Sequence, residues 1–508
     1  MIKQSLLVIS LLSTVSSFAQ KGDTVSVLQN VLERQQFDKC FIKPMFHNPA
    51  LHYYRYQSSL STLSLQGKVD EMYQYAVAQE GDGWKGFKIG AESFVLLSHN
   101  ARMWGKAYYE NGRRENVLWN ESSDFDIVYP YVAADTIGGD MKASTYFFNG
   151  GYAKAYKRWT FGGEFSYRAL MEFRDKDPRP KNTIADLQGR LGAAYNLHER
   201  YAIGLTADAQ KYKQNGSIQY YNELGVSKTF HLQGLGVSFV RFDGTNTTVN
   251  YQGNQWGVAL TLLPTSAKGG FFASVAFHRD FKEKILPNSN DLTLNDLHES
   301  LWRADWGWTS NAERKNVFGL KGLVDVRQRD GSEFLYGDAS GNVYPVIAVK
   351  ENFNRKWNAY GLESFYQRNQ TERWMFGGNL SMVYETREEV HKSSTNRMEW
   401  NSLNTKVNFS STWRYKKQLL KLKIGGEFQK KKDALLDIKR TTNGYALDIL
   451  KRNFNLYSAD VIGYHISANW SCRVWKNKLM FVESTWAQRK FQGFDKGYHV
   501  NVNVGLSF

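Results

Sequence analysis

Six charged or aromatic side chains occupy polar positions in segments whose other positions are apolar. They are Trp104, Arg168, Arg190, Phe365, Arg414 and Arg473. Guanidinium groups along a passage interact electrostatically with anionic or hydroxylated solutes that pass them. Aromatic faces stack on sugar rings and apolar groups. These residues are therefore our candidates for the lining of a selective pore. The alternative is structural: the charges pair across neighbouring strands, and the rings pack against an inserted segment.

Residues that could perform catalysis or hold a metal show no comparable organisation. The ten His residues are dispersed without metal-ligand spacing. No Gly-rich phosphate-binding loop precedes a helix, and no Gly-x-Ser-x-Gly motif occurs. We therefore expect no enzymatic activity, no catalytic residue, no metal and no cofactor.

The elements that must position the candidate residues are β-strands. Residues 498–508 alternate without error, with Tyr498, Val500 and Val502 on one face and small polar residues on the other. Side chains of a strand point alternately to opposite faces, so this segment has one apolar wall. Its length matches the roughly 9–11 residues that a tilted strand needs to cross a membrane. The same period of two recurs through most of the chain.

The connections predict how many strands there are. Short polar turns near residues 98–100, 156–158, 196–200, 265–268, 310–315, 367–373, 416–418 and 475–478 alternate with longer, polar segments such as 111–140, 215–247, 330–354 and 430–459. With a first strand at about residues 54–66, this predicts about 18 strands, within a range of 16–20, in an all-β, antiparallel, up-and-down transmembrane barrel with short periplasmic turns and long outer loops. Residues 215–247 contain the strand-like stretch 235–242, which could form a further hairpin.

The N-terminal region does not show the strand alternation of the rest of the chain. Residues 1–19 have a cation at Lys3, an apolar stretch and small residues before Gln20, which predicts a signal peptide and export from the cytoplasm. Residues 20–52 lack the alternation and form a periplasmic or lumenal segment with a short helix, and residues 53–508 form the barrel. Cys40 and Cys472 are not expected to pair. The net charge of +16 does not imply a nucleic-acid partner for an exported barrel.

The terminal strand resembles the assembly signal of Gram-negative outer-membrane β-barrel proteins, carried here by Val502, Val504, Leu506 and Phe508. The segment from His47 to Leu51 (HNPAL) is similar to the Asn-Pro-Ala segment of fatty-acid-transporter-type barrels. The resemblance implies the cell outer membrane as location, with lipid, lipopolysaccharide and the barrel assembly machinery as partners. Two functions follow: a porin-like channel or transporter for a small polar or amphipathic solute, or a barrel without transport that serves as partner or scaffold in a cell-envelope complex.

Overall fold

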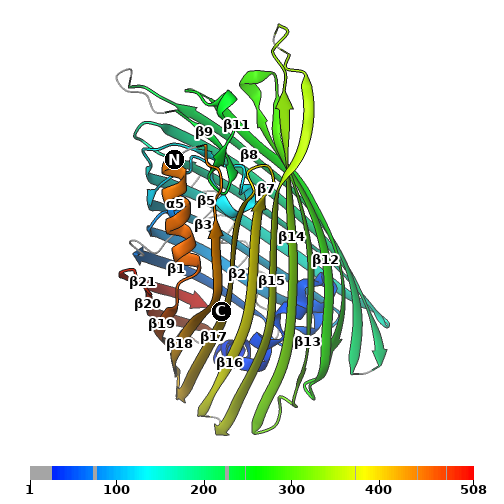
Figure 1. Cartoon of the computed structure of the whole chain (residues 1–508). Coiled ribbons are helices and arrows are strands. Elements are labelled where there is room, and N and C mark those ends of the chain that lie inside the picture. Colours follow the sequence, from blue (N-terminus) through cyan, green and yellow to red (C-terminus); the bar gives the residue numbers. More distant parts are fainter. Residues whose placement is uncertain are drawn as a thin grey trace, which may run out of the picture.

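The computed structural model describes residues 26–71, 77–198, 200–222, 228–245, 247–341, 343–371, 373–442, 444–475 and 477–508. Eighteen antiparallel strands form one sheet that closes on itself, as expected from the sequence (Figure 1). The strands are β1 (Leu60–Glu71), β2 (Gly83–Ser98), β3 (Ala101–Val117), β5 (Gly139–Tyr156), β6 (Trp159–Phe173), β7 (Arg179–His198), β8 (Tyr201–Gln219), β11 (Thr248–Pro264), β12 (Gly270–Leu286), β13 (Leu292–Thr309), β14 (Asn316–Tyr336), β15 (Val346–Thr371), β16 (Trp374–His391), β17 (Asn396–Tyr415), β18 (Gln418–Asp437), β19 (Val461–Trp475), β20 (Lys478–Phe491) and β21 (Lys496–Ser507).

The barrel closes where the last strand pairs with the first. Val504 of β21 lies opposite Leu65 of β1, and the backbone of Phe508 exchanges two hydrogen bonds with Ser61, of 2.8 and 2.9 Å. Closure leaves no unpaired strand edge in a membrane that offers no hydrogen-bond partners. The side chains of Val502 and Val504 are exposed on the outer surface, as the alternation predicts.

Alternation decides which side chains face outward. Large apolar residues such as Phe165, Leu191, Leu362 and Phe409 are exposed on the outside, where lipid would cover them. Residues of the opposite parity face the lumen, among them the charged and aromatic candidates. No described helix combines the length and apolar character needed to cross a membrane.

Two predictions about element boundaries are wrong. β1 begins at Leu60 and not at about residue 54, which is the last residue of the 3-10 helix η2 (Pro49–Tyr54). Much of the predicted loop 330–354 belongs to β14 and β15, whose hairpin rises above the rest of the barrel (Figure 1). Beyond the membrane both faces of a strand meet water, so pairing continues without the apolar alternation that identifies a strand in the sequence.

The remaining elements are not part of the barrel wall. β4 (Ala133–Ala134), β9 (Phe230–Gly234) and β10 (Val237–Ser238) form a separate three-stranded sheet, so the strand-like stretch 235–242 does not add to the barrel. The helices are α2 (Val27–Gln35), α3 (Phe37–Phe41), η1 (Lys43–His47), η2 (Pro49–Tyr54), η4 (Ala78–Glu80), α4 (Phe125–Val128), η5 (Val240–Phe242), η6 (Pro287–Ser289) and α5 (Gly444–Tyr457). Helix α2 confirms the helical spacing expected before the barrel; the predicted signal peptide lies outside the described residues.

Candidate functional site

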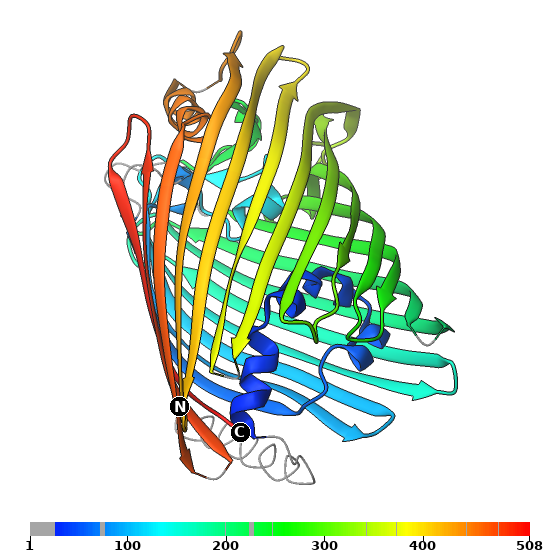
Figure 2. The same cartoon turned by 90° about the horizontal axis from the view of Figure 1, so that it is seen from below.

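The N-terminal segment, residues 26–55, lies inside the ring of strands at the end that carries the short turns (Figure 2). The Tyr53 hydroxyl donates to the carbonyl oxygen of His99 at 2.8 Å, and the Tyr54 hydroxyl donates to Oδ1 of Asn196 at 2.7 Å. Both acceptors belong to residues at or next to short turns. We call this segment the inner plug.

Apolar burial anchors the inner plug to the wall. Phe41, Met45, Phe46, Ala50 and Leu51 are buried in one cluster with lumen-facing residues of six strands, which are Ala194, Ala202, Leu263, Phe272, Val317 and Phe365. The rings of Phe37 and Phe41 lie 6.5 and 4.8 Å from the ring of Phe365. Phe365, a pore-lining candidate, thus contacts the plug. Burial of this apolar surface favours the docked position of the plug.

Three glycines in neighbouring strands form a socket for Asn48, Pro49 and Ala50. A Cβ atom on Gly192 of β7 would lie 2.0 Å from Oδ1 of Asn48, and one on Gly204 of β8 would lie 2.6 Å from its Nδ2. A Cβ atom on Gly162 of β6 would lie 2.5 Å from the backbone nitrogen of Ala50. Only glycine lets this backbone approach the strands so closely.

Asn48 fills the socket with polar contacts. Its Nδ2 donates to the carbonyl oxygen of Leu205 at 3.0 Å and to that of Ala193 at 3.4 Å. Its Oδ1 accepts from the N–H of Ala50 at 2.8 Å, which caps η2. The HNPAL motif therefore specifies how the plug meets the wall.

A chain of contacts joins the plug to two further candidates. His52 of η2 stacks on Trp104 of β3, with ring centroids 4.2 Å apart. The indole N–H of Trp104 donates to Oε2 of Glu164, and the guanidinium of Arg190 donates to Oε1 of the same carboxylate, both at 2.7 Å. One carboxylate in β6 therefore holds both candidate side chains against the plug.

The environment of His52 keeps its imidazole neutral. Burial, assisted by the nearby charge of Arg55, lowers the pKa of His52 to about 3. In the neutral form Nε2–H donates to the carbonyl oxygen of Phe46, 2.8 Å away. Protonation would place a charge on a buried ring beside a guanidinium.

Between the plug and the wall lies a cavity of about 680 Å³ with a charged lining. Its cationic residues are Lys43 and Arg55 of the plug and Arg190 and Arg303 of the wall, and its acidic residues are Glu164 and Asp305. Arg190 pairs with Glu164, and Arg303 with Asp305 at 2.9 Å. Among the described residues no carboxylate forms an ion pair with Lys43 or Arg55. The cavity therefore carries a surplus of positive charge that comes from the plug. We call it the central chamber.

A second cavity, of about 380 Å³, lies beside the central chamber. The two share His52, Arg55 and Glu164 in their linings. Lys88 and Lys106 add further cations, and Lys88 lies 3.7 Å from the ring centroid of Tyr108. Cations beside aromatic rings thus continue along the lumen.

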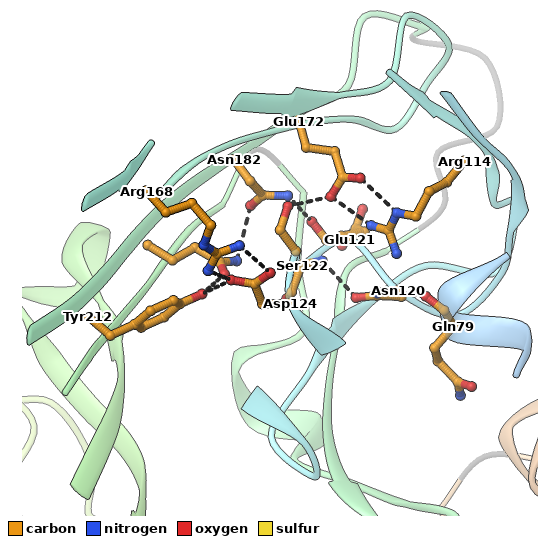
Figure 3. A network of polar contacts seen from close by, with 12 residues as sticks. Gln79, Arg114, Asn120, Glu121, Ser122, Asp124, Arg168, Glu172, Asn182 and Tyr212 are labelled. Carbon is orange, nitrogen blue, oxygen red and sulfur yellow. Dashed lines mark hydrogen bonds and ion pairs between the residues drawn. The ribbon is translucent and has the colours of Figure 1, made fainter. Parts of the chain in front are cut away.

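At the opposite end, the loop between β3 and β5 folds into the lumen, where polar contacts pin it to the wall (Figure 3). Arg168 of β6 donates to both carboxylate oxygens of Asp124, at 3.0 and 2.5 Å. The Tyr212 hydroxyl of β8 donates to the same carboxylate at 3.1 Å. The candidate Arg168 therefore anchors an outer loop.

Further contacts complete this outer closure. Arg114 binds Glu172 through two hydrogen bonds of 2.7 and 2.6 Å, and the Ser123 hydroxyl donates to Glu172 at 2.5 Å. Arg174 and Asp135, both almost fully buried, form an ion pair at 2.6 Å. Burial, together with the charge of Asp135, raises the pKa of Glu121 in this loop well above its usual range. Helix α5 packs beside the loops in an apolar cluster with Leu235, Met398 and Trp400.

The six candidates fall into three groups. Trp104, Arg190 and Phe365 contact or neighbour the inner plug, and Arg168 holds the outer loop. Arg414 and Arg473 lie near the turn ends of β17 and β19, where their backbone N–H groups donate to the carbonyl oxygens of the turn residues Arg373 and Lys417. The sequence did not single out Lys43, Asn48 or Arg55, because the segment that carries them shows no strand pattern. The HNPAL motif was the one feature of the sequence that could have marked this segment as part of the site.

Comparison with known proteins places the chain in a family. A family model matches residues 49–508. The chain belongs to the family described as a family of unknown function, DUF6850. No curated protein sequence matches the chain.

Solved structures of outer-membrane proteins are similar to the chain over most of its length. The toluene transporter TodX of Pseudomonas putida is 9% identical over 91% of this chain and 92% of its own, with a TM-score of 0.30. The ferric preacinetobactin receptor BauA of Acinetobacter baumannii is 10% identical over 89% and 79%, with a TM-score of 0.39. The ferric citrate transporter FecA is 7% identical over 89% and 79%, with a TM-score of 0.38. The fold assignment, an outer-membrane-type barrel of 18 strands, rests on the strand topology of the chain itself.

Proposed function

We propose that this protein is a gated transport barrel of the outer membrane, and that its solute is small and anionic. The observation that carries the proposal is the central chamber, a cavity of about 680 Å³ that lies between a docked plug and the barrel wall. A barrel of 18 strands has a lumen wide enough for a passage. Here the inner plug and the loop between β3 and β5 occupy parts of that lumen.

The chemistry of the plug supports the anionic solute. Lys43 and Arg55 contribute charge to the chamber without a carboxylate partner among the described residues, whereas the wall cations Arg190 and Arg303 are neutralised. Unpaired cations in a confined polar space attract anions. Because these cations belong to the plug, its displacement would change both the width and the charge of the passage.

The experiment is a flux measurement on the full-length protein in liposomes. We expect small anionic dyes to pass faster than cationic dyes of equal size. The double variant Lys43→Gln and Arg55→Gln should reduce this preference, whereas Lys268→Gln, in an exposed turn, should not. Absence of flux for both dyes, or an unchanged preference in the double variant, would contradict the proposal.

A second candidate function, that of a partner subunit, is favoured by the tip of the hairpin formed by β14 and β15. Val343, Val346, Ile347 and Val349 are exposed there. An apolar tip that extends beyond the barrel suits a protein partner at the cell surface. Crosslinking in intact cells from position 347, with position 392 of the neighbouring hairpin as control, distinguishes this function: a specific product from the tip alone supports it.

A further inference from the structure

A cluster of metal-ligating side chains forms where the inner plug meets the wall. It consists of His47 of η1, Asp208 of β8 and His278 of β12. Nε2 of His278 lies 3.3 Å from Oδ2 of Asp208, and Nε2 of His47 lies 3.7 Å from the same oxygen. One potential ligand atom from each residue lies within 4.8 Å of the other two.

These separations fit one metal ion. Nitrogen and oxygen ligands lie about 2.0–2.2 Å from Zn²⁺, so a tetrahedral arrangement sets them roughly 3.3–3.6 Å apart. Two imidazoles and one carboxylate are a ligand set that first-row divalent ions such as Zn²⁺ and Co²⁺ accept.

The polar atoms of the cluster are not satisfied by protein contacts. The side chain of Asp208 is 0% exposed, yet neither of its oxygens has a hydrogen-bond partner among the described residues. Nε2 of His47 also lacks one. A buried carboxylate without a hydrogen bond is costly, and a bound cation removes that cost. A simple His–Asp hydrogen bond does not account for the cluster, because neither contact meets hydrogen-bond geometry.

A glycine in the barrel wall allows two of the ligands, Asp208 and His278, to lie close together. Gly257 of β11 lies directly opposite Asp208 on one side and directly opposite His278 on the other. A Cβ atom on Gly257 would lie 2.2 Å from Cδ2 of His278 and 2.6 Å from Oδ2 of Asp208. The glycine therefore leaves the space over which the two side chains converge from strands that are not neighbours.

The third ligand comes from the plug. His47 stands between Phe46, which is buried in the apolar cluster, and Asn48, which fills the glycine socket, so its backbone is fixed on both sides. His47 and His278 also line the central chamber, where the side chain of His47 is 32% exposed. An ion can reach the site from the chamber and keep open positions toward it.

We propose that His47, Asp208 and His278 bind one divalent transition-metal ion of the Zn²⁺ type, with open coordination positions facing the central chamber. Because one ligand belongs to the plug and two belong to the wall, the bound ion latches the plug in its docked position. Metal binding does not require that the barrel transports a solute, so the two proposals can fail separately.

The test is metal binding by the full-length protein in detergent after treatment with a chelator. We expect one equivalent of Zn²⁺ to bind in calorimetry, and Co²⁺ to give a visible absorption band that Zn²⁺ displaces. His47→Ala, His278→Ala and the isosteric Asp208→Asn should each lower the affinity at least about tenfold. Zn²⁺ should also slow proteolysis of the plug, and His47→Ala should abolish that effect.

Two further variants make the test specific. His298→Ala removes an imidazole whose nearest carboxylate, that of Asp296, lies 4.0 Å away, and should leave binding unchanged. Gly257→Ala removes no ligand but should weaken binding by separating Asp208 from His278. Heat-modifiable mobility in electrophoresis verifies that each variant is folded. Absence of stoichiometric binding, or binding that the ligand variants leave intact, would overturn the inference.

Discussion

The socket for Asn48 gives the sharpest test of how the plug is held. In Gly192→Ala, the new methyl group would lie 2.0 Å from Oδ1 of Asn48 and 2.9 Å from Cδ of Pro49. Asn48 is fully buried, so it has no room to move aside. We expect the plug to leave the socket in this variant while the barrel stays folded.

The magnitude follows from the hydrogen bonds that leave with Asn48. Two bonds to the wall are lost, from Nδ2 of Asn48 to the carbonyl oxygens of Leu205 and Ala193, whereas its bond with the N–H of Ala50 lies within the plug. Each contributes about 1 kcal/mol net, so the docked state loses about 2 kcal/mol relative to the undocked state. Since 1.4 kcal/mol is a factor of ten, the undocked fraction should rise about 30-fold.

Limited proteolysis and amide hydrogen exchange of residues 26–55 measure this fraction. Exchange of plug amides should accelerate by up to about 30-fold if opening is in rapid equilibrium. The matched control is Gly189→Ala in the same strand, where an added Cβ meets no atom within 4 Å. Equal protection of the plug in Gly192→Ala and in the wild type would refute the reasoning, as would equal effects of the two substitutions.

Three further predictions concern pH, the outer closure and the lipid face. The folded-state pKa of His52, about 3, lies below the usual value of 6.5, so its stabilising contribution is present above pH 6.5 and is lost as the pH falls towards 3. Plug docking should weaken by about 2 kcal/mol at pH 5 in proteolysis assays, and His52→Phe should flatten this dependence. Arg168→Gln and Asp124→Asn should each destabilise the outer loop by about 2 kcal/mol, and the double variant should cost much less than the sum; additive losses would exclude a coupled pair. Phe409→Arg should destabilise the barrel by about 2–4 kcal/mol in denaturant unfolding, whereas Asn408→Arg should be tolerated, and equal losses would contradict the assigned faces.

The sequence by itself determined the barrel. Alternation is a local property: Phe409 and Leu422 reveal an outward face without knowledge of their neighbours, and the final residues to Phe508 reveal the last strand. Eight short turns fixed the strand count. The predicted strand boundaries were wrong where the membrane no longer imposes alternation, as in the hairpin of β14 and β15 and before Leu60.

Only the tertiary structure decided what fills the lumen. Arg168 shows its polar parity in the sequence, but its partner Asp124 lies in a loop without any pattern. Gly192 and Gly204 become a socket only when Asn48 docks between their strands, and His47, Asp208 and His278 meet only in the closed barrel. Contacts across a lumen join residues far apart in the chain, and no local spacing encodes them. The strand period therefore predicts which side chains face inward, whereas barrel closure and plug docking decide which of them meet.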